Sequence, residues 1–283
     1  MRSHYTADDG EELFVYVAGE GPPIVMLHGW TASHQEWAAV LHTLSARHTV
    51  YRWDARGHGG HPLGRDTPVT VERMARDLEN LLDHFRLEGV TAVGHSMGAL
   101  TLWEHIRGHG GRRIARLCLI DQSPKLVTDR DWPLGIYGDF DRERSRRFID
   151  ELRQDFAEAV LRLSAYGLNP RARQLYEQNT RGWQKSREIL RALPPAPLIR
   201  CWQSLCEADY RDVLDKIDVP VLLIFGAESN FYSLDVPNFL LRRIAQANLR
   251  VYEGSDHSPH RWHRDRFAGD LLEFATIDCR MER

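Results

Sequence analysis

Lysine is scarce in this chain, and neither sign of charge is in large excess. The 283 residues include 37 lysines and arginines, of which all but Lys125, Lys185 and Lys216 are arginine. With 40 aspartates and glutamates, the net charge is only −3. A charge this small gives no strong field for a nucleic acid or a membrane surface, so we expect neither as a partner. The arginine excess is more typical of genome base composition than of recognition.

Long apolar runs are also missing. No run approaches the length of a membrane span, and the first ten residues, MRSHYTADDG, do not resemble a signal peptide. We therefore expect a cytoplasmic protein. The four cysteines show no C-x-x-C or metal-ligand spacing, and we expect reduced thiols that pack in the interior. They are Cys118, Cys201, Cys206 and Cys279.

The most informative motif that is present lies at residues 91–100, TAVGHSMGAL. It places Ser96 in a G-x-S-x-G pattern between an apolar run typical of a strand and a run typical of a helix, which is the signature of a nucleophile elbow. A sharp turn exposes the serine hydroxyl to a base and requires small residues nearby, here Gly94 and Gly98. We predict that Ser96 is a nucleophile and that the backbone N–H of Met97 stabilises an oxyanion.

A base is expected late in the chain, because this motif is followed by an acid and then a histidine. Residues 251–260, VYEGSDHSPH, read as a short strand that breaks at Gly254 into a loop carrying His257. A histidine in such a loop can lean over the sheet edge and take the serine proton. We predict that His257 is the base, with His260 and His263 as ordinary surface histidines.

The second oxyanion donor is expected in the loop after an early strand. Residues 23–30, PIVMLHGW, form a buried run that ends in His28-Gly29, where glycine allows close approach and the Trp30 amide can point inward. With this motif the chain resembles the α/β-hydrolase family over nearly its whole length. The resemblance rests on His28-Gly29, Asp54-x-Arg56-Gly57-His58-Gly59, Gly94-His95-Ser96-Met97-Gly98 and the His257 loop.

The resemblance implies an α/β fold with a mostly parallel, doubly wound sheet and a Ser-His-acid triad that usually hydrolyses a bond at a carbonyl. The acid departs from the commonest family pattern, because Ser229 occupies the position where most members carry aspartate. Two carboxylates remain open: Asp121, at the end of the preceding strand, and Glu228, next to the usual position. Some family members similarly place the acid on the sixth strand, and we favour Asp121. Asp256 is a weaker candidate, since adjacent side chains on an extended segment diverge.

Periodicity divides the chain into a core and an insertion. Apolar residues recur at helical spacing over 71–86, and strands alternate with helices from about 23 to 115 and from about 219 to 276. Residues 124–214 show helical stripes, such as Ile149 to Leu163, and prolines at 194, 195 and 197, without a convincing strand. We predict a hydrolase core from 1–123 and 215–283, with a helical cap over 124–214.

The cap is expected to build the substrate pocket together with the core. An aromatic, glycine-interrupted stretch at 131–138 follows the favoured acid and is predicted to cross above the site. The alternating charges at 139–154 are most simply a solvated helix face. The residues predicted to line the pocket are Trp30, Trp132, Tyr137 and His95.

These residues predict a serine hydrolase that cleaves an ester or related acyl bond of a small, largely apolar substrate through an acyl-enzyme. We expect no cofactor and no metal, because the resemblance assigns the run with Asp54, Arg56, His58 and His61 to a structural turn. The protein is expected to be a monomer or homodimer. Three alternatives stay open: a cofactor-independent dioxygenase, a perhydrolase or haloperoxidase-like activity, and a non-catalytic ligand receptor. Simple esters, lactones, thioesters, amides and carbon–carbon bonds beside a carbonyl all fit as substrates.

Overall fold

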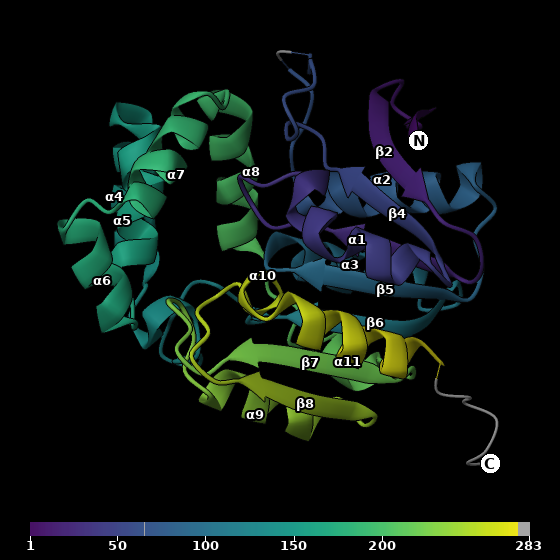
Figure 1. Cartoon of the computed structure of the whole chain (residues 1–283). Coiled ribbons are helices and arrows are strands. Elements are labelled where there is room, and N and C mark those ends of the chain that lie inside the picture. Colours follow the sequence, from purple (N-terminus) through teal and green to yellow (C-terminus); the bar gives the residue numbers. More distant parts are fainter. Residues whose placement is uncertain (65, 277–283) are drawn as a thin grey trace.

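The computed structural model describes residues 1–64 and 66–276 (Figure 1). Its centre is an eight-stranded sheet with the order β1-β2-β4-β3-β5-β6-β7-β8. β2 pairs antiparallel with β1 and with β4, and all the other neighbours run parallel. The mostly parallel sheet predicted from the sequence is therefore confirmed. The strands are β1 (Arg2–Thr6), β2 (Glu12–Ala18), β3 (Pro23–Leu27), β4 (Thr49–Asp54), β5 (Val90–His95), β6 (Ile114–Ile120), β7 (Val221–Gly226) and β8 (Ala247–Tyr252).

Helices cover both faces of this sheet. Val25 and Leu27 of β3 point into a core shared with α2, α3 and α9, whereas Ile24 and Met26 of the same strand point into a core shared with α1 and α11. This alternation explains why the central strands read as continuous apolar runs. The helices of this part are α1 (Ala38–Ser45), α2 (Val71–His84), α3 (Met97–His109), α9 (Asp235–Arg243), α10 (Pro259–Trp262) and α11 (Arg264–Thr276), with the 3-10 turn η1 (His34–Trp37).

The segment between β6 and β7 is helical. In Figure 1, α4 to α7 form a lobe beside the sheet, and α8 stands between this lobe and the strand ends. The elements of this segment are η2 (Ile136–Gly138), α4 (Arg142–Gln154), α5 (Phe156–Ala165), α6 (Pro170–Glu177), α7 (Arg181–Arg191), α8 (Pro195–Glu207) and η3 (Leu214–Lys216). Among the residues that the structure describes, no helix has both the length and the apolarity that a membrane crossing requires.

Two sequence signals in this segment have clear structural causes. The apolar stripe from Ile149 to Leu163 belongs to two helices, because the chain breaks at Asp155, whose side chain accepts the Glu158 N–H and caps α5. The proline cluster marks the start of α8. Pro195 is tolerated there because the backbone N–H that proline lacks would have no partner within the first turn of the helix.

The three cysteines that the structure describes are free thiols. Cys118 and Cys201 are buried and Cys206 is half-buried. Burial raises the pKa of the Cys206 thiol to about 12, with a hydrogen bond from Ser145 opposing it. These three cysteines are packing thiols, as predicted, and Cys279 lies outside the described residues.

Candidate active site

Ser96 occupies a sharp turn between β5 and α3. Its backbone has φ 52° and ψ −115°, a conformation that costs energy in any residue with a Cβ and persists only where the surroundings enforce it. A Cβ added to Gly94 would lie 2.6 Å from the Gly98 backbone, and one added to Gly98 would lie 2.3 Å from the Leu27 carbonyl oxygen. The two glycines therefore let α3 start close against β5 and β3, and the turn predicted from the sequence is present.

His257 and Asp121 lie within hydrogen-bonding distance of each other. His257 is in the loop after β8, Asp121 directly follows β6, and His257 Nδ1 lies 2.8 Å from Asp121 Oδ1. A carboxylate only accepts, so Nδ1–H donates, and Nε2 of the neutral ring is the basic nitrogen. The Ser96 N–H donates to the Ile120 carbonyl at 3.1 Å, so the serine and the acid lie at the same end of neighbouring strands.

Ser229, at the position of the common acid, supports Asp121 directly. Its hydroxyl donates to Asp121 Oδ1 at 2.7 Å, and the Gly226 N–H donates to Oδ2 at 2.9 Å. Asp121 is fully buried and, like Ser96, has a positive φ, here 45°. Glu228 is exposed and faces a surface cavity of about 490 Å³, so the structure brings Asp121, and not Glu228, to His257.

The loop after β7 supplies further neighbours of His257 that the sequence did not indicate. The Asn230 side-chain oxygen accepts a hydrogen bond from the backbone N–H of His257 at 3.3 Å. The Phe231 ring packs edge to face against the imidazole, with 4.5 Å between the ring centres. Burial lowers the pKa of His257 from its ordinary value of 6.5, although the hydrogen bond and charge of Asp121 oppose this shift. Loop residues such as these carry no periodicity, which is why sequence analysis missed them.

The loop after β3 passes over Ser96. A Cβ added to Gly29 would lie 3.4 Å from Ser96 Cβ and 2.9 Å from His95 Nδ1. Among the residues that the structure describes, the backbone N–H groups of Trp30 and Met97 donate to no backbone carbonyl. Both predicted oxyanion donors therefore lie in segments that border Ser96 and are free of the hydrogen bonds of regular secondary structure.

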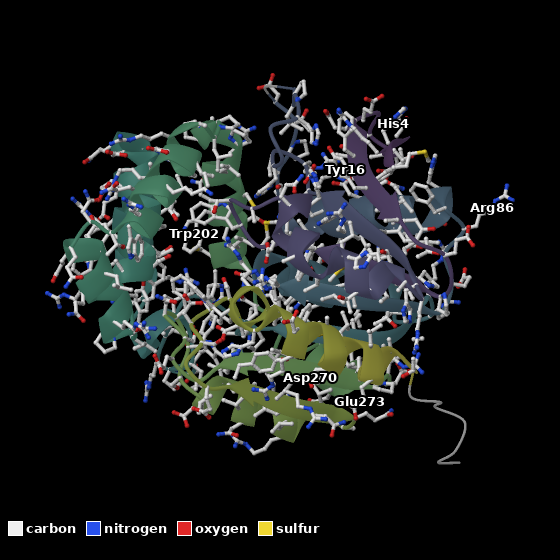
Figure 2. All side chains as sticks on the ribbon, in the orientation of Figure 1. His4, Tyr16, Arg86, Trp202, Asp270 and Glu273 are labelled. Carbon is white, nitrogen blue, oxygen red and sulfur yellow. The ribbon has the colours of Figure 1, made fainter. Side chains whose placement is uncertain are left out.

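Helix α8 joins the helical lobe to this site. The Trp30 indole N–H donates to the Leu198 carbonyl at 2.9 Å, and its ring lies 4.6 Å from the ring of Trp202. The Cys201 thiol lies 3.5 Å from the sulfur of Met97. Figure 2 shows Trp202 on the side of the lobe that faces the core. Aromatic surface from both parts of the chain thus lies beside Ser96.

Tyr137 contacts the loop after β7, whereas His95 does not have the pocket position that the sequence suggested. The Tyr137 hydroxyl donates to the Leu163 carbonyl, and its backbone N–H donates to the Phe231 carbonyl at 2.8 Å, so the backbone of this half-buried residue braces the loop that contacts His257. His95 is 6% exposed and points beneath the turn, where it contacts Glu36. It precedes Ser96 at the end of a fully buried strand, which explains its inward direction.

Trp132 is a correction to the predicted pocket. It is 3% exposed, its indole N–H donates to the Lys125 carbonyl at 2.9 Å, and its ring packs edge to face against Phe239 of α9 at 4.9 Å. The guanidinium of Arg211 lies 5.2 Å from the centre of the same ring. An aromatic residue after the acid strand was expected to turn toward the site, but this one packs against α9 with its polar atom satisfied.

The substitution Trp132→Ala is therefore expected to affect stability more than specificity. Removing a buried tryptophan leaves a cavity, and we expect the free energy of unfolding to fall by about 3–5 kcal/mol. Chemical denaturation measures this loss. Rates on esters of increasing chain length should all change by a similar factor, and a changed chain-length preference at unchanged stability would contradict this placement.

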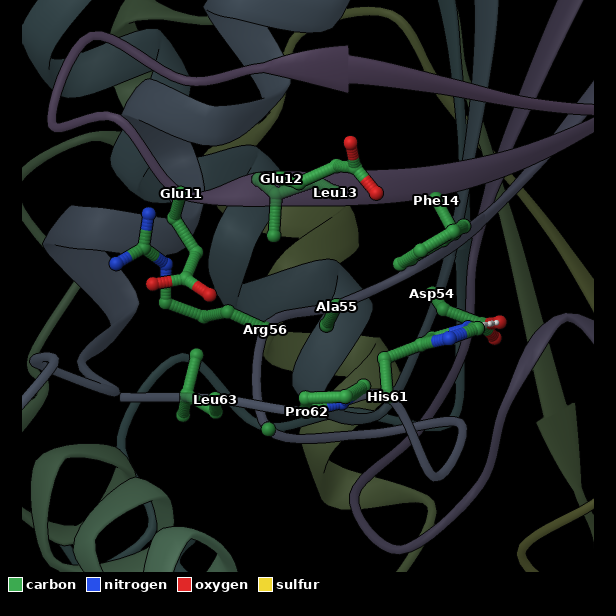
Figure 3. A pocket seen from close by; sticks show the side chains of 11 residues that line it. Glu11, Glu12, Leu13, Phe14, Asp54, Ala55, Arg56, His61, Pro62 and Leu63 are labelled. Carbon is green, nitrogen blue, oxygen red and sulfur yellow. Dashed lines mark hydrogen bonds and ion pairs between the residues drawn. The ribbon is translucent and has the colours of Figure 1, made fainter. Parts of the chain in front are cut away.

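The run after β4 forms a structural turn around a buried carboxylate (Figure 3). Asp54 accepts the His34 backbone N–H at 2.6 Å, and contacts the His34 ring at 2.9 Å and the His61 ring at 2.8 Å. A Cβ on Gly59 would lie 2.5 Å from the Asp54 carboxylate, so a glycine is needed there. The cavity beside it measures only about 10 Å³, and Arg56 is bound instead to Asp77. Asp54 and Arg56 thus serve separate networks.

Comparison with known proteins agrees with this architecture. The family model described as "alpha/beta hydrolase fold" matches residues 22–263. A non-heme haloperoxidase of Rhodococcus erythropolis is 28% identical over 286 residues, covering 95% of this chain and 97% of that protein. A pimeloyl-[acyl-carrier protein] methyl ester esterase of Vibrio atlanticus is 26% identical, covering 94% and 98%. The structure of an esterase from Exiguobacterium antarcticum superposes with a TM-score of 0.84 at 23% identity, covering 97% of this chain and 99% of that one.

Proposed function

Because the chain belongs to the alpha/beta hydrolase fold family, we propose that it is a serine hydrolase that cleaves a carboxylic ester or a related acyl bond. The observation that carries this proposal is the buried Asp121–His257 pair at the strand ends beside the strained turn of Ser96. A buried carboxylate that orients an imidazole next to an exposed hydroxyl is the arrangement that activates a serine nucleophile.

In the first step, His257 Nε2 takes the proton of the Ser96 hydroxyl while Oγ bonds to the substrate carbonyl carbon. The carbonyl π electrons move to the oxygen, and the backbone N–H groups of Met97 and Trp30 donate to this oxyanion. Each donor is expected to lower the barrier by about 3 kcal/mol. Asp121 stabilises the imidazolium and keeps Nδ1 protonated, so that Nε2 faces the reaction.

Collapse of the oxyanion then expels the alcohol, which takes the proton from the His257 imidazolium and leaves an acyl-enzyme on Ser96. Water, deprotonated by the same imidazole, attacks the acyl carbon in the second half of the reaction and restores the serine. Side chains and backbone amides handle every proton and charge in this sequence. The proposed chemistry therefore requires no metal and no cofactor.

The aromatic surroundings favour a small, largely apolar substrate. Trp30 and Trp202 face each other across the junction of core and lobe, and Phe231 lies against His257. Such surfaces can bury an acyl or alcohol group next to the reacting carbonyl. The similar protein of Vibrio atlanticus is named for a methyl ester, which is a carboxylic ester.

A panel of p-nitrophenyl esters of increasing acyl length, with stopped-flow detection of the first turnover, tests the proposal. We expect a burst of one p-nitrophenol per chain followed by slower steady turnover, because the acyl-enzyme forms before it hydrolyses. Peracid formation from acetate and hydrogen peroxide is measured in parallel, since another similar protein is named a haloperoxidase. Peracid formation without any ester turnover would reject the hydrolase.

The pH dependence of kcat/KM provides a second test. Burial lowers the pKa of His257 below 6.5, and the ring must be neutral to accept the serine proton. The rate is therefore expected to be retained below pH 6.5 and to fall only as the pH drops through the lowered pKa. Initial rates between pH 4 and 9, with a stable ester at low substrate concentration, check this limb. An acid limb centred well above 6.5 would exclude this environment for the base.

A further inference from the structure

A buried carboxylate beneath the site contacts all three of its loops. Glu36 lies in η1, and its side chain is 2% exposed. Oε2 accepts the Gly29 N–H at 2.9 Å, while Oε1 lies 2.5 Å from His95 Nδ1 and 2.8 Å from His260 Nε2. Gly29 belongs to the loop over Ser96, His95 directly precedes the serine, and His260 lies three residues after His257.

A second link closes this network. His95 Nε2 lies 2.9 Å from the backbone carbonyl oxygen of His257. A carbonyl oxygen only accepts, so this nitrogen must carry a proton, and Nδ1 faces a carboxylate, which also only accepts. Nδ1 lies 2.5 Å from the Glu36 carboxylate oxygen, a distance that an unprotonated nitrogen would not hold against an anion, so we assign His95 as an imidazolium in an ion pair with Glu36.

The electrostatic surroundings agree with this assignment. Burial opposes charge on His95, but the adjacent Glu36 carboxylate outweighs it and the pKa of His95 is raised. Burial likewise opposes charge on Glu36, yet the charge of His95 and the bonds from His260 and His95 hold its pKa well below the usual range. Burial lowers the pKa of His260 to about 4, so that ring is neutral and donates through Nε2.

The distances decide between hydrogen bonds and a bound cation. Glu36, His95 and His260 each offer an atom of a type that binds metals, all within 4.8 Å of one another. Ligand atoms around one tetrahedral zinc ion lie about 3.3 Å apart, given bond lengths near 2.0–2.1 Å. The contacts of 2.5 and 2.8 Å are shorter than that, and they are a direct ion pair to His95 and a hydrogen bond to His260.

We propose that Glu36 and His95 are positioning residues, whose buried ion pair holds the oxyanion loop, the serine turn and the His257 loop in register. This inference rests on the proposed ester hydrolysis and adds residues to that site. None of the side chains of Glu36, His95 and His260 needs to contact the substrate. Their effect on the rate comes from alignment, since a misplacement of about 1 Å costs about 10²-fold in rate.

The variant Glu36→Gln tests the proposal, because its amide can accept the Gly29 N–H but cannot accept from two further donors. We expect kcat/KM and the rate of fluorophosphonate reaction with Ser96 to fall about 10²-fold, with KM for the ester changed far less than kcat. His260→Phe keeps the ring packing against Trp37 and removes one hydrogen bond, so its loss of rate is expected to be nearer tenfold, or about 1.4 kcal/mol, the scale of a single hydrogen bond.

The acid limb of kcat/KM provides a readout that a purely structural role would not move. The ionisable groups that face His95 are Glu36 from η1, His28 from the end of β3, Asp121 from the end of β6, His257 from the loop after β8 and His260 from α10. Loss of Glu36 leaves His95 neutral, which removes the nearest cation from His257. Its pKa then rises, and the acid limb is expected to shift to higher pH.

A matched control is the pair of Glu79 and His105, where the carboxylate lies 2.6 Å from Nε2 between α2 and α3. Glu79→Gln is expected to lower the melting temperature without changing the rate or the pH profile. Equal kinetics for Glu36→Gln and wild type would overturn the proposal. So would one equivalent of zinc retained by the purified protein and lost in Glu36→Gln, which would make the cluster a metal site.

The ionisation of His95 can be read without any enzyme assay. Long-range ¹H–¹⁵N spectra of the imidazoles, assigned by loss of a signal in His95→Gln, should show both His95 nitrogens protonated at pH 7. A neutral His95 in the wild type would overturn the network. If wild type neither hydrolyses esters nor reacts with fluorophosphonate, the proposed function fails on its own evidence, and this spectrum still decides the ion pair.

Discussion

The substitution Ser96→Ala is expected to reduce ester turnover by about 10⁶-fold, the loss that removal of a triad serine produces. No other hydroxyl can replace Ser96, because only this side chain stands on the strained turn between β5 and α3. Alanine keeps the Cβ and the backbone strain, so the fold should be retained. Steady-state rates on a p-nitrophenyl ester and a thermal melt of the same preparation measure both quantities.

Labelling separates loss of the nucleophile from loss of structure. A fluorophosphonate probe should modify wild type at Ser96 alone, as judged by peptide mass spectrometry, and should leave Ser96→Ala unmodified. Ser255→Ala is a suitable control, since it removes another buried hydroxyl near His257 that has no hydrogen-bond partner among the described residues. That variant should still be labelled at Ser96 by the fluorophosphonate and should still show the burst of p-nitrophenol. Label on a different serine, or turnover that survives in Ser96→Ala, would reject the mechanism.

The substitution Asp121→Asn is expected to lower kcat by about 10⁴-fold. Asp121 accepts the Gly226 N–H on one oxygen and the His257 and Ser229 donors on the other. An asparagine has one acceptor oxygen, and pointing it at Gly226 turns its N–H groups toward the imidazole. His257 would then accept through Nδ1 and carry its proton on Nε2, which is the wrong tautomer for taking the Ser96 proton.

Glu228→Gln is the matched comparison, because it removes a carboxylate from the position next to the common acid. The Glu228 side chain is exposed and makes no described contact with His257, so we expect its loss to lower the rate by no more than tenfold, or about 1.4 kcal/mol in the barrier. Single-turnover rates of Asp121→Asn and Glu228→Gln, measured at pH 8, test this prediction. A crippled Glu228→Gln together with an active Asp121→Asn would mean that the acid comes from the loop after β7.

Sequence reasoning succeeded where the chemistry depends on local chain geometry. The two glycines around Ser96 predicted the sharp turn, since a Cβ at either position would collide with a neighbouring backbone segment. Asp121 was favoured because it ends the strand that follows that of Ser96 and because some family members similarly place the acid there, and the carboxyl ends of these two parallel strands do meet at one edge. The family resemblance implied the mostly parallel, doubly wound sheet, and the alternation of strands and helices in the sequence agreed with it.

It failed where partners are distant in sequence. Trp132 has the composition of a pocket residue, and only the packing of α9 shows that its ring is used there. Glu36 and His260 are 224 positions apart, and each alone reads as a surface residue. Their contact depends on how the first and last loops fold over the same strand ends. No periodicity or spacing in either segment records that contact.

The hydrogen bond from Ser229 to Asp121 bears on how this site could have evolved. Position 229 already reaches the oxygen that orients the imidazole, at 2.7 Å. A lineage could therefore move the acid between the two loops by two substitutions. The intermediate with carboxylates at both positions could not keep both ionised in one buried site, so it would share a proton between them. Such an ancestor would still present one negative charge to His257, and the exchange need never have passed through an inactive enzyme.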